Sequence, residues 1–188
     1  MAEKKHEGEL TFAITDGVEI ECKGGRNITV KGKKGALERR FREDFISINK
    51  EDKNIRINAK SKRFPLRKQM AIMGAIAGHI KNMMKGVTEG YTYKLRIVYS
   101  HFPMKVSTKG PEFTVDNFLG EKYPRKTKVL EGVKVEIKGN EVTVTGIDKE
   151  LVGQTAANIE QLTRIKNFDL RVFQDGIYII EKDSKPVI

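Results

Sequence analysis

The stretch that decides the fold is residues 133–146, V-K-V-E-I-K-G-N-E-V-T-V-T-G, because residues 18–32, V-E-I-E-C-K-G-G-R-N-I-T-V-K-G, look like an earlier copy of it. In both stretches apolar residues occupy every second position on either side of a glycine-containing turn, a pattern typical of a β-hairpin. Any two hairpins share that alternation, but here the turn and closing glycines also match. We therefore interpret the pair as a duplication, which predicts two related domains in tandem.

Each half of the chain also carries one helix pattern among its strand patterns. In the first half, apolar residues at spacings of three and four predict a helix from Pro65 to about Gly86. Gly74 and Gly78 are unfavourable within that helix and, being four apart on one face, predict the close approach of another backbone. In the second half, Asp148 is placed to cap a second helix.

The predicted fold class is α+β, with two tandem duplicated domains. Each domain is expected to be an antiparallel β-sheet with one packing α-helix. The expected boundaries are 1–88 for the N-terminal domain and 89–188 for the C-terminal domain, which would end in a short tail.

The chain has 188 residues, a formal net charge of +11 and a pI of about 9.6. This charge favours a polyanionic partner, of which nucleic acid is the commonest and an acidic membrane surface the competing alternative. No apolar run approaches the roughly 20 residues that span a bilayer, and residues 1–9 are polar without a signal-peptide core. We expect a cytoplasmic protein that does not bind membranes.

The sequence contains little that points to catalysis or to a bound cofactor. Its single cysteine, Cys22, alternates with Val18 and Ile20 and is expected to be a buried apolar residue. The three histidines have no metal-ligand spacing, and no nucleophile–base, phosphate-loop or dinucleotide motif is present. We expect no enzyme activity, metal, cofactor or small-molecule substrate. An RNA-processing hydrolase or transferase would need paired acidic residues, which here are scattered.

Basic residues cluster in both halves. Residues 1–90 hold 20 Lys and Arg against 12 Asp and Glu, and residues 91–188 hold 16 against 13. Charge alone therefore places the main RNA-binding face in the first half. In the second half, Tyr123 lies within the basic run 122–128, a composition that can bind phosphate and stack on a base. A merely solvated charged loop is the alternative. Residues 32–35, G-K-K-G, resemble a KH-type backbone clamp but lie between strands, which favours a basic turn.

Several longer motifs resemble a universal large-subunit ribosomal protein family, numbered six in bacterial naming and nine in eukaryotic naming. The matching segments are H-I-K-N-M-M-K-G-V-T-E-G-Y at 79–91, Y-S-H-F-P at 99–103, N-F-L-G-E-K at 117–122, V-G-Q-T-A-A-N-I at 152–159 and F-Q-D-G-I-Y at 173–178. The resemblance covers about residues 10–182. It is closest to the archaeal and eukaryotic branch, and most like archaeal members.

This resemblance implies a structural constituent of the large ribosomal subunit that supports translation. It implies binding to large-subunit (23S-like) rRNA near the sarcin–ricin loop and the factor-binding stalk base. The implied partners are this rRNA, neighbouring large-subunit ribosomal proteins and, through transient proximity, translation factors. In the family the second domain supplies most RNA contacts, which conflicts with the charge count, and we follow the family. A free RNA-binding regulator outside the ribosome is the alternative.

We combine the resemblance with the basic clusters to name candidate RNA-binding residues. Bacterial contact residues near 166–171 cannot be transferred singly, because this chain lacks the bacterial Tyr-Lys-Gly-Lys-Gly run there. The candidates are His101, Lys105, Lys122, Tyr123, Arg125, Lys126, Gln154, Asn158, Arg164, Lys166, Asn167, Arg171 and Gln174. Secondary RNA or protein contacts are expected at Lys33, Lys34, Lys60, Lys62 and Arg63.

Overall fold

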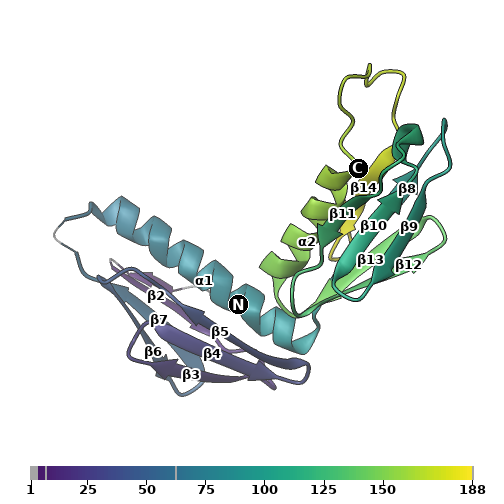
Figure 1. The fold of residues 1–188 in the computed structure, drawn as a ribbon. Coiled ribbons are helices and arrows are strands. Elements are labelled where there is room, and N and C mark those ends of the chain that lie inside the picture. The colour runs from purple at the N-terminus through teal and green to yellow at the C-terminus, as the bar shows by residue number, and fades with distance from the viewer. Residues whose placement is uncertain (1–3, 7, 62, 188) are drawn as a thin grey trace. The chain divides into compact units, whose positions relative to one another are not determined.

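The computed structural model describes residues 4–6, 8–61 and 63–187. Contacts between residues divide the chain into two compact units, Met1–Glu89 and Gly90–Ile188, here called unit 1 and unit 2. Each unit is considered by itself (Figure 1).

Unit 1 contains two antiparallel sheets and one helix. The four-stranded sheet has the order β1-β2-β7-β6, and the three-stranded sheet has the order β3-β4-β5. The helix α1, Leu66–Thr88, follows the last strand. The strands are β1 (Lys4–His6), β2 (Glu9–Ala13), β3 (Glu19–Lys23), β4 (Asn27–Gly32), β5 (Gly35–Arg40), β6 (Ile46–Glu51) and β7 (Asn54–Ala59).

Unit 2 has a similar composition of elements. A five-stranded sheet has the order β12-β13-β8-β14-β15, and a three-stranded sheet has the order β11-β10-β9. The helix α2 is Lys149–Leu162, and the short 3-10 helix η1 is Phe118–Gly120. The strands are β8 (Tyr91–Val98), β9 (Lys105–Lys109), β10 (Glu112–Asp116), β11 (Arg125–Lys128), β12 (Val133–Lys138), β13 (Glu141–Gly146), β14 (Gly176–Lys182) and β15 (Lys185–Pro186). The predicted fold class, α+β in two duplicated domains, is confirmed.

The topology shows the duplication, but the hairpins that occupy equivalent positions in the two units are not the pair that the sequence suggested. Both hairpins exist: β3 pairs with β4, and β12 pairs with β13. However, β12–β13 directly precedes α2 and its second strand pairs with β8, just as β6–β7 directly precedes α1 and its second strand pairs with β2. The counterpart of β3-β4-β5 is the three-stranded sheet β9-β10-β11. The sequence match therefore joined two hairpins from different positions in the repeat.

The two helices bury the faces that their sequence patterns indicated. In α1, Met73, Ile80 and Val87 are among the fully buried residues. In α2, the side chain of Asp148 accepts a hydrogen bond from the N–H of Glu150 at 2.8 Å, so the predicted N-cap is confirmed. A Cβ placed on Gly74 or Gly78 would meet nothing within 4 Å, so the expected approach of another backbone is wrong within the described chain.

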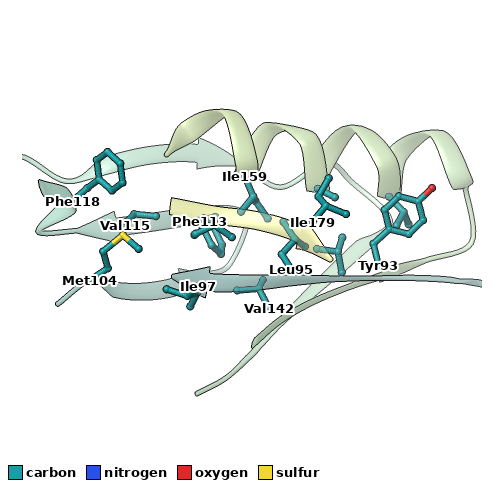
Figure 2. Packing of buried hydrophobic residues seen from close by; sticks show 14 of the residues in the cluster. Tyr93, Leu95, Ile97, Met104, Phe113, Val115, Phe118, Val142, Ile159 and Ile179 are labelled. Carbon is teal, nitrogen blue, oxygen red and sulfur yellow. The ribbon is translucent and has the colours of Figure 1, made fainter. Parts of the chain in front are cut away.

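The core of unit 2 lies between α2 and the strands, as Figure 2 shows. Ile159 points from the helix toward Leu95 on β8 and Phe113 on β10, and all three side chains are fully buried. At one end of this cluster Phe118 and Met104 complete the packing. The same residues thereby fix the bases of the loops that follow β8 and β10, which contain the candidates His101, Lys122 and Tyr123.

Candidate nucleic-acid interface

Asp175 joins two loops that are far apart in the sequence. It lies directly before β14 and is only 1 % exposed. Its carboxylate accepts a hydrogen bond from the N–H of Ser100, and its Oδ2 lies 2.7 Å from Nδ1 of His101. The His101 ring also stacks on Phe173, with 4.4 Å between the ring centroids. The segment that follows β8 is thereby attached to the segment that precedes β14.

The pKa of Asp175 reflects these contacts. Burial raises the pKa of Asp175. The hydrogen bonds from the Ser100 N–H and from the side chain and backbone of His101, together with the charge of His101, lower this pKa and outweigh burial. The net effect is a pKa below the ordinary value, so the carboxylate is charged at neutral pH. A buried carboxylate is stable only when it is paired in this way.

Arg125 joins a third segment to the same end of unit 2. Its guanidinium donates to the backbone carbonyls of Leu162 at 2.8 Å and Arg164 at 3.1 Å, and it forms two hydrogen bonds with Glu121 at 2.6 and 2.8 Å. It also lies over the Phe118 ring, 4.2 Å from the centroid. These bonds engage four of its five N–H donors, so the geometry gives Arg125 an internal bracing role.

The turn around η1 packs on the first of these loops. The side-chain amide of Asn117 donates to the Pro103 carbonyl at 3.0 Å, and the Phe102 ring lies beside Gly120. Asn117 and Leu119 both have left-handed backbones, with φ of 57° and 48°, which keep the turn tight. We call residues 99–104, 117–124 and 163–175 together the loop end of unit 2. Figure 1 shows the last of these segments, in yellow-green, extending beyond the sheet.

The loop end carries most of the candidate residues. Tyr123 is 85 % exposed, and Arg171 is exposed while its guanidinium contacts the Asp169 carboxylate at 3.1 and 3.2 Å. That contact lowers the pKa of Asp169. Asn167 has a left-handed backbone with φ of 64°. The other exposed candidates here are Lys122, Arg164, Lys166 and Gln174.

Four candidates lie on the strands and helix that lead to the loop end. Gln154 and Asn158 lie one turn apart on α2, and the Gln154 amide donates to the Asn158 carbonyl oxygen at 2.8 Å. Lys105 opens β9, where its backbone is paired with Asp116 just before η1. The ammonium of Lys126, on β11, lies 3.2 Å from the carboxylate of Glu112 on the neighbouring strand β10.

The loop end also exposes apolar side chains that the sequence did not predict. Phe168, Leu170 and Val172 are 51 %, 64 % and 61 % exposed. Phe168 packs against Phe173 with 4.8 Å between ring centroids. In the sequence these residues alternate with charged ones, which is the pattern of a half-buried strand, so nothing local signals their exposure. Tyr99 and Phe102 add further exposed aromatic area on the neighbouring loop.

The secondary candidates in unit 1 do not form one surface. Lys34 lies at the C-terminal end of α1, where its N–H donates to the Val87 carbonyl at 2.9 Å and its ammonium contacts the Glu89 carbonyl. Lys33 precedes it in the same turn. Lys60 and Arg63 lie in the connection before α1, whose 23 residues correspond to a length of about 34 Å. Lys62 lies outside the described residues.

In the described part of the chain, no group of three or more His, Cys, Asp or Glu side chains is arranged to hold a metal ion. Neither described helix is both long and apolar enough to cross a membrane.

Comparison with known proteins finds one family model and relatives that match most of the chain. The model of the family described as ribosomal protein L6 matches residues 8–90 and 102–176. The chain is 49 % identical over 172 residues to a protein from Methanococcus vannielii named large ribosomal subunit protein uL6, covering 92 % of each chain. It is 46 % identical over 169 residues to a protein of the same name from Methanothrix thermoacetophila, covering 90 % of this chain and 94 % of the relative.

Proposed function

We infer the function from one premise: this chain belongs to the ribosomal protein L6 family. It is a structural constituent of the large ribosomal subunit and not an enzyme, it acts in translation, and its location is the ribosome in the cytoplasm. Its partners are rRNA and other ribosomal proteins. The finer question is which surface of the chain contacts the rRNA, and the geometry of unit 2 supports one answer.

In our proposal the loop end of unit 2 is the main rRNA-binding surface. The observation that carries it is the bracing of three segments by two side chains, Asp175 and Arg125. Loops that are fixed in this way lose less backbone conformational entropy when they bind, which lowers the cost of association. Rigid loops also hold phosphate contacts at constant spacing, which sets the register of the protein on the RNA.

The exposed side chains suit single-stranded or irregular RNA better than a regular helix. Lysines and arginines of the loop end would neutralise phosphates, and the rings of Tyr123, Phe168 and Tyr99 offer faces on which unpaired bases stack. Polar groups at Gln154, Asn158 and Gln174 would bind sugars or base edges. Arg125 would contribute mainly by holding the surface in shape.

The proposed position in the subunit rests on the family resemblance. We place the loop end at large-subunit rRNA near the sarcin–ricin loop and the factor-binding stalk base. Neighbouring large-subunit proteins would pack on the remaining surface, and translation factors would pass nearby. The net charge of unit 1 does not oppose this placement, because a phosphate contact needs a local cluster of cations and a net charge does not say where the cations lie.

The test is RNA binding by the full chain with two exposed cations neutralised. The variant R164Q/K166Q is compared with the wild type on a transcript of the rRNA domain that contains the sarcin–ricin loop. Removing two phosphate contacts should reduce the magnitude of the slope of log K against log salt by about 1.4–1.8. The matched control is K134Q/K138Q on β12, whose lysines are exposed and paired with Glu136. An equal loss in the control, or no loss in R164Q/K166Q, would overturn the proposal.

A further inference from the structure

Four arginines gather at one end of the three-stranded sheet of unit 1. Arg40 is the last residue of β5 and pairs with Asn27, which directly follows Arg26. The N–H of Phe41 donates to the Arg26 carbonyl at 3.0 Å, which holds the two chain segments together. Arg39 and Arg42 lie in the sequence on either side of Arg40 and Phe41. We call Arg26, Arg39, Arg40 and Arg42 the arginine cluster of unit 1.

Two adjacent hollows open at this cluster. One has a volume of about 510 Å³ and lies between the end of β5 and α1, with Ile72, Ala75 and His79 on the helix side. The other has a volume of about 460 Å³ and is lined by Arg26 and Asp44. Both hollows share Arg40, Phe41 and Arg42 as a common wall. Phe41 is buried, so the backbone between Arg40 and Arg42 is anchored to the core of unit 1.

The linings of the two hollows carry more cationic than anionic side chains. Four arginines face two carboxylates, Glu43 and Asp44, in the linings of the two hollows. Asp44 is paired with Arg26. Arg40 and Arg42 are both exposed, and no side-chain hydrogen bond or ion pair engages either guanidinium within the described residues. Two adjacent guanidinium groups are therefore available to an external anion.

The helix wall beside the arginines leaves room for a bulky partner. Ala75 lines the larger hollow, and Ala71, Gly74 and Gly78 lie within a turn of it on the same helix. A Cβ placed on either glycine would meet nothing within 4 Å, so no other described part of the chain covers the helix surface at these two positions.

We propose that the arginine cluster of unit 1 binds backbone phosphates of rRNA, as a second contact separate from the loop end of unit 2. This inference rests on the proposed function, since the ribosomal subunit supplies the RNA. Arginine favours this ligand because its planar guanidinium offers paired donors that match phosphate oxygens. Neither lining contains a side-chain amide, and of the two rings present Phe41 is buried and His79 packs against it, so the contact reads the backbone and not the base sequence.

The experiment measures binding of the full chain to a large-subunit rRNA transcript over a range of salt concentrations. The variant R40Q/R42Q should reduce the magnitude of the salt slope by about 1.4–1.8, while its melting temperature stays at the wild-type value. The variant R40K/R42K keeps the charge and should keep most of the slope. The control is K50Q/K53Q, which removes two exposed lysines of unit 1 that line neither hollow.

The outcomes separate this inference from the proposed function. If R164Q/K166Q loses affinity and R40Q/R42Q binds like the wild type, the arginine cluster is not an RNA contact and the loop end remains one. If R40Q/R42Q binds the transcript normally but enters large subunits poorly, its partner is an acidic protein segment and the proposal is wrong. If both double variants retain the wild-type slope, the inference and the proposed function both fail.

Discussion

Gly146, the last residue of β13, lies directly against Val152 of α2. A Cβ placed on Gly146 would come 2.7 Å from Cγ2 of Val152 and 3.2 Å from the Gly132 carbonyl oxygen. Both distances are shorter than van der Waals contact, so the helix can approach the sheet this closely only when residue 146 has no side chain. The closing glycine of the hairpin is therefore needed for packing and not for the conformation of the turn.

This contact predicts that Gly146→Ala destabilises unit 2. Overpacking of a rigid interface costs roughly 1–3 kcal/mol in the free energy of unfolding. Urea denaturation of the purified chain would measure it. The control is Gly153→Ala, one residue beyond Val152, where the added Cβ would meet Tyr93 at an ordinary 3.8 Å. Because alanine is the better helix former, this control should be neutral or stabilising. Equal stability of the two variants would contradict the packing account.

Asp175→Asn should change the dependence of stability on pH. The pKa of Asp175 is lower in the folded chain than its ordinary value of about 3.9. The charged carboxylate therefore stabilises the fold above that ordinary value, and the stabilisation is lost as pH falls through the lowered pKa. The variant should be less stable than the wild type at pH 7 by about 1–3 kcal/mol, and the difference should shrink below about pH 4.

Thermal unfolding between pH 2 and pH 7 would measure this difference, with Glu131→Gln on an exposed turn as the control. A difference between D175N and the wild type that stays constant across the range would show that the hydrogen bonds do not depend on the charge of Asp175.

Arg125→Lys distinguishes a bracing residue from a direct RNA contact. Lysine keeps the positive charge, but its three donors on one nitrogen cannot reproduce the four bonds that Arg125 makes with Leu162, Arg164 and Glu121. Amide hydrogen exchange in residues 162–166 should become faster, and the melting temperature should fall. If exchange and melting stay unchanged while RNA affinity falls, Arg125 acts on the RNA and not on the loops.

Tyr123→Ala should weaken RNA binding without affecting the fold. The side chain is 85 % exposed, so its removal should leave the melting temperature unchanged. Stacking of a base on an aromatic ring contributes about 1–3 kcal/mol, which corresponds to a loss of roughly 5- to 150-fold in affinity for the rRNA transcript. Tyr123→Phe keeps the stacking face and should bind like the wild type. An equal loss in both variants would assign the effect to the hydroxyl group.

The sequence predicted the fold class because each element has its own periodic pattern. The apolar stripe of α1 and the Asp148 cap of α2 are local signals, and the structure has both. The equivalence of the hairpins was predicted incorrectly, because alternation with a glycine turn is common to all hairpins and says nothing about strand order. Strand order depends on pairing between distant strands, such as β13 with β8.

The candidate site was less predictable for the same reason. The contact between His101 and Asp175 joins residues 74 positions apart, and no local pattern connects them. Composition identified Arg125 as a cation but could not show that its donors are engaged inside the unit. The arginine cluster of unit 1 lay within a segment that composition alone marked as charged, and only the fold brings Arg26 beside Arg40.

The most direct test of the central claim is RNA–protein crosslinking in the assembled large subunit, with the crosslinked peptides mapped on this chain. Crosslinks in unit 2 should concentrate in residues 99–126 and 154–175, with a separate group at residues 39–43 of unit 1. Crosslinks confined to unit 1, with none in the loop end of unit 2, would contradict it.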